Sequence, residues 1–272
     1  MSPVATLSEL LKDVDDEYGD CRRLVDRLPA DAPEWDRATP AEGWAVRDQI
    51  SHLAFFDDAG RRAMVEPEAF ARSAAEAMAA GGDPMLAHLV RGRAMDGDAL
   101  LSWWGEAHQA MMAAFADADP SARLPWYGPP MGMLSFLSAR LMETWAHGTD
   151  VADALGVVRQ PTDRLRHIAH LGVRTRPFSY LVREREVPAG RIDVVLASPS
   201  GEEWEFVVGS SEDSTLVATV TGPALDFCLV VTQRRHVADT ALVVRGDLAA
   251  DWLSVAQAFA GPPGPGRSGQ AG

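Results

Sequence analysis

The spacing of apolar residues changes near residue 156, and this change constrains the fold more than any other feature of the sequence. Before it, apolar residues recur at steps of three and four, the period of one face of an α-helix. After it come short segments rich in β-branched residues, partly alternating with polar ones, as in strands. A chain of 272 residues is also longer than most single domains. We therefore expect an α+β protein with two domains, residues 1–155 and 156–260.

The first domain is expected to contain four long helices. Thr6 and Glu9 have the spacing of a capping box, and the amphipathic run that they open continues to Leu28. The other three helices are expected at residues 46–64, 98–116 and 134–155.

Two segments interrupt these helices. The stretch 68–93 has a helical pattern that is broken by Gly81, Gly82 and Pro84. The segment PWYGPPMG, residues 125–132, contains three prolines and two glycines and is expected to be irregular.

The second domain is expected to be small and mixed. Its strands are predicted at residues 191–197, 203–208, 215–221 and 241–244. Gly222 and Pro223 mark the start of a helix, and the last helix begins after Asp247. The tail, residues 261–272, has too few apolar side chains to anchor it and is predicted to be disordered.

Charge and composition exclude several classes of partner. The formal net charge is −14 and Lys12 is the only lysine, so the chain lacks the basic surface that nucleic acids or anionic membranes require. No segment approaches the roughly 20 apolar residues of a membrane helix. Cys21 and Cys228 lack the spacing of a redox or metal site and are expected to be buried side chains. We expect a cytoplasmic monomer or homodimer with a small-molecule substrate.

Three side chains of the first domain have the pattern of a metal site. Glu143 and His147 are four residues apart, which places them one turn apart on the same side of a helix. His52 lies in the apolar-periodic run QISHLAFF, so all three are expected to face the helical core. Two imidazoles and a carboxylate leave a zinc ion at least one open position, as in catalytic sites. Ni²⁺ and Fe²⁺ suit the same ligands, so the prediction is a divalent metal with Zn²⁺ favoured.

Four further residues are candidates near that site. Asp150 shares the face of Glu143 and His147, where it either orients an imidazole or is an ordinary helix-surface residue. Arg234 and Arg235 are expected to end the second domain's helix, where a cation is favourable in itself. Their guanidinium groups would equally suit a substrate carboxylate or phosphate. Trp145 is expected either to line a substrate pocket or to pack in the core.

Two runs of sequence carry a family resemblance, GWAVRDQISHLAFFD at residues 43–57 and LMETWAHGTDVADAL at residues 141–155. Together they resemble the DinB-like family, and within it the mycothiol-dependent maleylpyruvate isomerases. The shared pattern is Gly-Trp-x-x-x-Asp before His-Leu, followed by Glu-x-x-x-His-x-x-Asp. The resemblance implies that His52, Glu143 and His147 occupy metal-ligand positions.

The same resemblance implies an architecture and a chemistry. Gly43, Trp44 and Asp48 match the turn that enters the first ligand helix, in a DinB-like four-helix metal domain. That domain is joined to an α+β domain similar to sterol carrier proteins. The family's chemistry uses a low-molecular-weight thiol that becomes a thiolate at the metal, as the metal's charge favours. PWYGPPMG and the run VTQRRH, residues 231–236, are not assigned to the isomerases proper and indicate a separate, actinobacterial-type subgroup.

The leading functional hypothesis is a metal-dependent, mycothiol-type isomerase or transferase that acts on a small anionic substrate. One alternative is a protein that binds an apolar or acyl ligand in its second domain and holds a structural metal. Another is a hydrolase that uses zinc-bound water. No phosphate-binding glycine loop and no GxSxG motif is present, so nucleotide-dependent and serine-hydrolase functions have no support.

Overall fold

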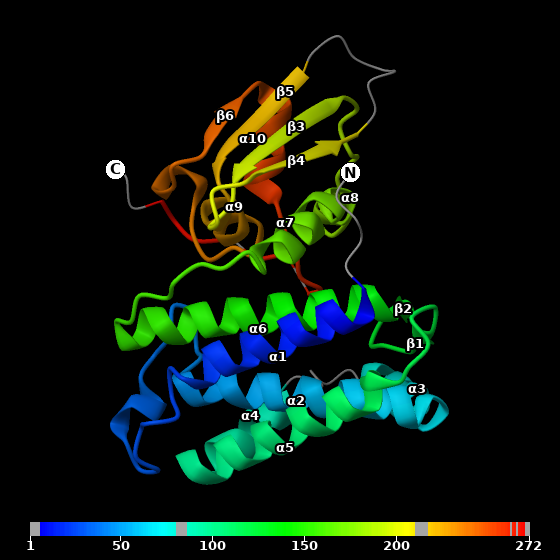
Figure 1. Ribbon diagram of the computed structural model, residues 1–272, viewed down its shortest axis with the longest axis vertical. Coiled ribbons are helices and arrows are strands. Elements are labelled where there is room, and N and C mark those ends of the chain that lie inside the picture. Colours follow the sequence, from blue (N-terminus) through cyan, green and yellow to red (C-terminus); the bar gives the residue numbers. More distant parts are fainter. Residues whose placement is uncertain (1–5, 80–85, 210–216, 262, 265, 270–272) are drawn as a thin grey trace. The chain divides into compact units, whose positions relative to one another are not determined.

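The computed structural model describes residues 6–79, 86–209, 217–261, 263–264 and 266–269 (Figure 1). The chain separates into two compact units, Met1–Arg159 and Gln160–Gly272. In the described residues the protein is α+β, as the sequence predicted, and it has ten α-helices and two small sheets.

The first unit consists mainly of helices that pack along one another. They are α1 (Leu7–Arg22), α2 (Val46–Val65), α3 (Pro67–Ala79), α4 (Leu86–Arg93), α5 (Gly97–Ala116) and α6 (Met133–Leu155). Helix α2 packs against α5 and α6, and α1 packs against α6 and α5. Ile50, Leu53, Trp104 and Val151 are fully buried in one core cluster of this unit. The four predicted long helices correspond to α1, α2, α5 and α6.

Helix α1 starts as predicted but ends earlier. Thr6 accepts a hydrogen bond from the Glu9 amide and the Glu9 carboxylate accepts one from the Thr6 amide, which completes the capping box. The expected continuation to Leu28 is wrong, because α1 ends at Arg22 and turns follow. Pro29 disfavours a helical conformation at Leu28, so the apolar run extends beyond the helix itself.

The interrupted segments of the first unit differ from each other. The predicted helix break at Gly81, Gly82 and Pro84 lies outside the described residues. Around the PWYGPPMG segment, β1 (Arg123–Leu124) and β2 (Met131–Gly132) pair in antiparallel fashion. The sequence did not predict this pair of two-residue strands.

The second unit is a four-stranded sheet with four helices. The strands β3 (Arg191–Ala197), β4 (Glu203–Val208), β5 (Val217–Pro223) and β6 (Val243–Arg245) lie in the order β4-β3-β5-β6. Strand β3 runs parallel to β5 and antiparallel to β4, and β5 runs antiparallel to β6. Alternate residues Ile192, Val194 and Leu196 are fully buried, which gives the sheet one apolar face.

The helices of this unit are α7 (Leu165–Arg174), α8 (Arg176–Leu181), α9 (Ala224–Val231) and α10 (Asp247–Val255). His167 and His170 lie on α7. Main-chain oxygens of Gly261 and Gly264 accept hydrogen bonds from Gln257 and Arg183. The predicted disordered tail lies partly outside the described residues. Among the described residues, no helix is long and apolar enough to cross a membrane.

Candidate metal centre

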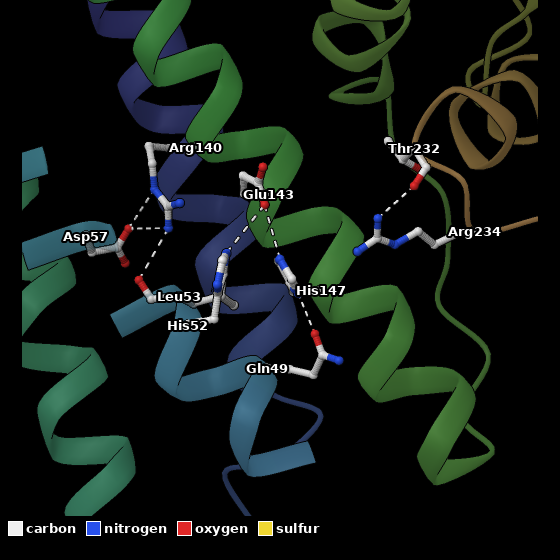
Figure 2. Close-up of polar contacts among 9 residues, drawn as sticks. All are labelled: Gln49, His52, Leu53, Asp57, Arg140, Glu143, His147, Thr232 and Arg234. Carbon is white, nitrogen blue, oxygen red and sulfur yellow. Dashed lines mark hydrogen bonds and ion pairs between the residues drawn. The ribbon is translucent and has the colours of Figure 1, made fainter. Parts of the chain in front are cut away.

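Helices α2 and α6 bring His52, Glu143 and His147 together as the sequence predicted (Figure 2). Each residue contributes one potential ligand atom, and the three atoms lie within 4.8 Å of one another. Nε2 of His147 is 3.1 Å and Nε2 of His52 is 3.7 Å from Oε2 of Glu143. Both histidines are 8% exposed, so the cluster lies inside the helical unit.

This donor set fits a divalent ion such as Zn²⁺. Two ligand atoms at about 2.0–2.2 Å from one tetrahedral ion lie roughly 3.3 Å apart, and the two observed separations fall on either side of that value. Two imidazole nitrogens and one carboxylate oxygen also leave an open position for water or a substrate atom. The residues present therefore fit a catalytic type of metal site.

The electrostatics of the cluster prepare it for a cation. Burial and, to a smaller extent, the neighbouring His147 together lower the pKa of His52 to about 4, although the Glu143 carboxylate opposes the shift. Burial alone would raise the pKa of Glu143, but hydrogen bonds with His147 and His52 hold it well below its usual value. Near neutral pH the cluster thus combines a neutral His52 with an ionised carboxylate, the protonation states that metal binding requires.

Gln49 orients His147 from outside the ligand set, and the sequence analysis missed it. Oε1 of Gln49 contacts Nδ1 of His147, and Nε2 of Gln49 donates to Oγ1 of Thr39 at 2.8 Å. When Nδ1–H of His147 donates to the amide oxygen of Gln49, the lone pair of Nε2 would be available to a bound ion. The only indication of this role in the sequence is the position of Gln49, which precedes His52 by three residues on α2.

Trp44 lies against both histidines. Its ring centroid is 5.3 Å from that of His52 and 5.8 Å from that of His147, and the latter pair is stacked. Phe56 packs on the other side of His52 at 4.6 Å, and His88 of α4 lies 5.3 Å from it. Aromatic rings therefore surround the histidine of α2.

The turn before α2 is built to hold Trp44 in place. Gly43 has a φ of +76°, a conformation that favours glycine. Asp48 accepts the Ala45 amide at the start of α2 and forms an ion pair with Arg93. Arg93 also donates to the Gly43 carbonyl at 3.2 Å. The Gly-Trp-x-x-x-Asp pattern thus fixes both the entrance of the ligand helix and the tryptophan beside it.

A buried ion pair joins the same two helices one turn away. Arg140 donates through Nε and Nη2 to Oδ1 of Asp57 at 3.1 and 2.8 Å, and through Nη2 to the Leu53 carbonyl at 3.3 Å (Figure 2). His108 of α5 has its Nδ1 3.8 Å from Oδ2 of Asp57 and its Nε2 3.0 Å from Oδ1 of Asp15.

The remaining candidates on α6 are buried. Asp150 is fully buried and Trp145 is 6% exposed. The helix-surface alternative for Asp150 is therefore wrong, while its role in orienting an imidazole stays a prediction. Gly148, next to His147, has little room for a side chain, because an added Cβ would lie 3.0 Å from Sγ of Cys21 and 3.0 Å from Nη1 of Arg159. Cys21 and Cys228 are both buried, as predicted, and burial raises the pKa of Cys21 to about 12.

Arg234 and Arg235 lie in the second unit, beyond the end of α9. The expected helix end at these residues is wrong, because α9 ends at Val231 and Gln233 is left-handed with a φ of +59°. The Arg234 amide donates back to the Leu229 carbonyl, as chains do at a helix C-terminus. Nη1 of Arg234 donates to the Thr232 carbonyl at 2.7 Å (Figure 2). A substrate contact for either arginine stays a prediction.

Comparisons with known proteins identify relatives over most of the chain. The family described as "Mycothiol maleylpyruvate isomerase N-terminal domain" matches residues 14–152, a range that contains all three candidate ligands. Two proteins of Mycobacterium tuberculosis, from strains CDC 1551 / Oshkosh and H37Rv, are each 44% identical over 258 residues. The match covers 92% of this chain and 95% of each relative, and both carry the name "Uncharacterized protein".

Solved structures show the same fold at lower sequence identity. A crystal structure of the mycothiol-dependent maleylpyruvate isomerase is similar with a TM-score of 0.57, and a mutant of that enzyme with 0.55. Each is 18% identical, and the match covers 85% of this chain and 90% of the other. At this identity the likeness concerns the fold.

Proposed function

Because the chain belongs to the mycothiol maleylpyruvate isomerase N-terminal domain family, we propose that it is a metal-dependent enzyme of the thiol-dependent isomerase or transferase class. The observation that carries the proposal is the convergence of His52, Glu143 and His147 within 4.8 Å in the family-matched region. A bound Zn²⁺ would supply a Lewis acid that lowers the pKa of a thiol at the open position. Ni²⁺ and Fe²⁺ are the other metals that these ligands suit.

The chain's own residues perform the tasks that surround this chemistry. His52, Glu143 and His147 hold the ion, and Gln49 fixes the ring of His147 through its Nδ1. The aromatic rings of Trp44 and Phe56 limit the water that reaches His52. A bound ion would favour the thiolate form of the cosubstrate, and the thiolate sulfur would be the nucleophile toward an electrophilic carbon of the substrate.

The substrate is proposed to be a small anionic molecule, and a low-molecular-weight thiol of the mycothiol type is the cosubstrate. Arg234 and Arg235 are the candidates to hold its carboxylate or phosphate, and Trp145 is a candidate for the wall of its pocket. We place the protein in the cytoplasm, where its buried Cys21 and Cys228 remain reduced thiols. For the second unit we propose an α+β fold similar to that of sterol carrier proteins.

Elemental analysis of the purified protein, with His52→Ala and His147→Ala beside the wild type, tests the proposal. About one metal ion per wild-type chain, absent from both folded variants, supports it. A thiol-dependent turnover assay on small anionic electrophiles then follows. A wild-type protein that takes up no Zn²⁺, Ni²⁺ or Fe²⁺ would sink the proposal.

The same assays separate the two alternatives. Turnover that persists without any low-molecular-weight thiol would indicate hydrolysis by zinc-bound water. Apolar or acyl molecules that co-purify with the protein, without thiol-dependent turnover, would indicate a ligand-binding protein with a structural metal.

A further inference from the structure

We infer that the buried Asp57–Arg140 pair is a positioning device for the candidate metal centre, fixing how α2 and α6 present their ligands to each other. This inference rests on the proposed metal site and deepens it. The pair has no place among the ligands, and it lies where the two ligand helices face each other (Figure 2).

The position of the pair couples it to all three ligands. Arg140 precedes Glu143 by three residues, so the two side chains leave the same side of α6. On α2, Arg140 binds the carbonyl of Leu53, the residue next to His52, and the carboxylate of Asp57 one turn further on. One guanidinium therefore holds α2 at two points, directly beside the ligand that α2 contributes.

Because the pair is buried, separating the two side chains is energetically costly. Asp57 is 2% and Arg140 is 3% exposed, so neither charge is solvated if the other moves away. A buried ion pair adds little net stability, because desolvation offsets the attraction of the charges, but separating its members is costly. A sliding or rotation of α6 on α2 would break the hydrogen bonds of Arg140, and the same movement would separate His52 from Glu143.

The pair is itself held in place by the other two long helices. His108 of α5 lies beside Asp57, and its second ring nitrogen contacts Asp15 of α1. The His108 ring stacks on Tyr18 of α1 with a centroid distance of 3.9 Å. Asp57 thus receives contacts from α5 and α6, and the polar chain through it reaches all four long helices.

Two variants remove the positioning contact in different ways. Asp57→Leu with Arg140→Met replaces the pair by apolar side chains of similar size, a change that often leaves stability unaltered. Arg140→Lys keeps the charge but loses the planar fork that reaches Asp57 and Leu53 together. The matched control is Arg22→Lys, because Arg22 also donates to a main-chain carbonyl across helices, that of Leu101, but joins α1 to α5.

The measurement is the dissociation constant for Zn²⁺ by chelator competition, together with the visible absorption spectrum of the Co²⁺-loaded protein. We expect about 10- to 100-fold weaker Zn²⁺ binding and an altered Co²⁺ spectrum in both positioning variants, the size found for residues that orient metal ligands. Arg22→Lys should bind both ions as the wild type does. A folded double variant with the Zn²⁺ affinity and Co²⁺ spectrum of the wild type would overturn the inference. If the double variant does not fold, the same result in Arg140→Lys would overturn it.

A second readout separates this inference from the proposed function. If wild-type protein binds no metal, the proposed function fails. The positioning role of the Asp57–Arg140 pair is then tested by the imidazole ¹⁵N–¹H signals of His52 and His147 in metal-free protein. Shifted signals in Arg140→Lys but not in Arg22→Lys support positioning. Signals that match the wild type in both variants would refute it.

Discussion

The two units of the chain differ in what they bury. Among the described residues, the helical unit buries nine ionisable side chains besides its cysteine: Glu17, Asp48, His52, Asp57, His88, His108, Arg140, His147 and Asp150. Within the described part of the mixed unit, Arg176 is the one buried ionisable side chain besides Cys228 and Tyr180, and the core there includes Trp204, Phe227 and Trp252. Both units have long apolar cores, so the difference lies in the polar groups placed inside them.

This difference indicates how the two units divide stability and chemistry. A buried charge is costly unless it is paired, so a core with many of them is retained for a reason other than stability. The ionisable groups of the helical unit are concentrated around the facing sides of α2 and α6, where the candidate ligands lie. The mixed unit instead has an apolar interior suited to a stable scaffold. Four predictions test this contrast.

The largest expected effect is in the core of the mixed unit. Trp252 is fully buried against Phe227, so Trp252→Ala should lower the free energy of unfolding by about 3–5 kcal/mol. Trp252→Phe keeps most of the contacts and should cost much less. Denaturant unfolding and Zn²⁺ stoichiometry are the measurements. Loss of Zn²⁺ binding in a folded Trp252→Ala protein would contradict the assignment of stability to the mixed unit and of metal chemistry to the helical unit.

The next effect is a pH dependence of stability that arises from His52 of the helical unit. In metal-free protein the pKa of His52 is lowered to about 4, below its usual 6.5. Above pH 6.5 the residue is neutral in both states and has no effect. As the pH falls from 6.5 toward 4, the unfolded chain binds a proton that the folded protein does not, so stability decreases by up to about 3 kcal/mol. Chemical unfolding at several pH values should show this slope, and His52→Gln should flatten it.

Metal binding should then stabilise the protein through the same unit. Zn²⁺ at 100 times its dissociation constant should raise the free energy of unfolding by about 2.7 kcal/mol. Glu143→Gln, which removes a charged ligand atom, should lose most of this gain. Thermal unfolding with Zn²⁺ and with a chelator measures both. An equal gain in the variant would place the bound ion elsewhere.

A smaller effect is expected at Gln49, outside the ligand set. Gln49→Leu removes the contact to Nδ1 of His147 and should weaken Zn²⁺ binding about 10- to 100-fold. Gln49→Glu retains an acceptor for Nδ1–H and should bind more tightly than the leucine variant. Chelator competition measures both constants. Identical affinities in the two variants would exclude an orienting role for this side chain.

Local patterns in the sequence predicted most of the elements and the ligand set. The helix period placed α2, α5 and α6 nearly to the residue, and the i, i+4 spacing of Glu143 and His147 predicted their common face. The predicted strands 191–197 and 203–208 match β3 and β4. These features depend on neighbours along the chain, which a single sequence contains.

What the sequence did not predict depends on contacts between distant residues. Arg140 and Asp57 are separated by 83 positions and Gln49 and His147 by 98, so no spacing rule joins them. Asp150 shares a face with the ligands, but its complete burial is set by the other helices of the unit. The end of α1 at Arg22 was also missed, because Pro29 disfavours a helical conformation only at Leu28 and no glycine or proline lies between Arg22 and Leu28.

The contact between Gly148 and Cys21 has a consequence for how such chains diverge. An added Cβ at position 148 would meet Sγ of Cys21, and the glycine directly follows the ligand His147. A larger residue at position 148 therefore requires the side chains of Cys21 and Arg159 to shift by a few tenths of an ångström, so the size of residue 21 should vary with that of residue 148 between lineages. In a collection of related sequences, that paired variation would mark the chains in which α1 still lies tightly against the histidine-bearing turn of α6.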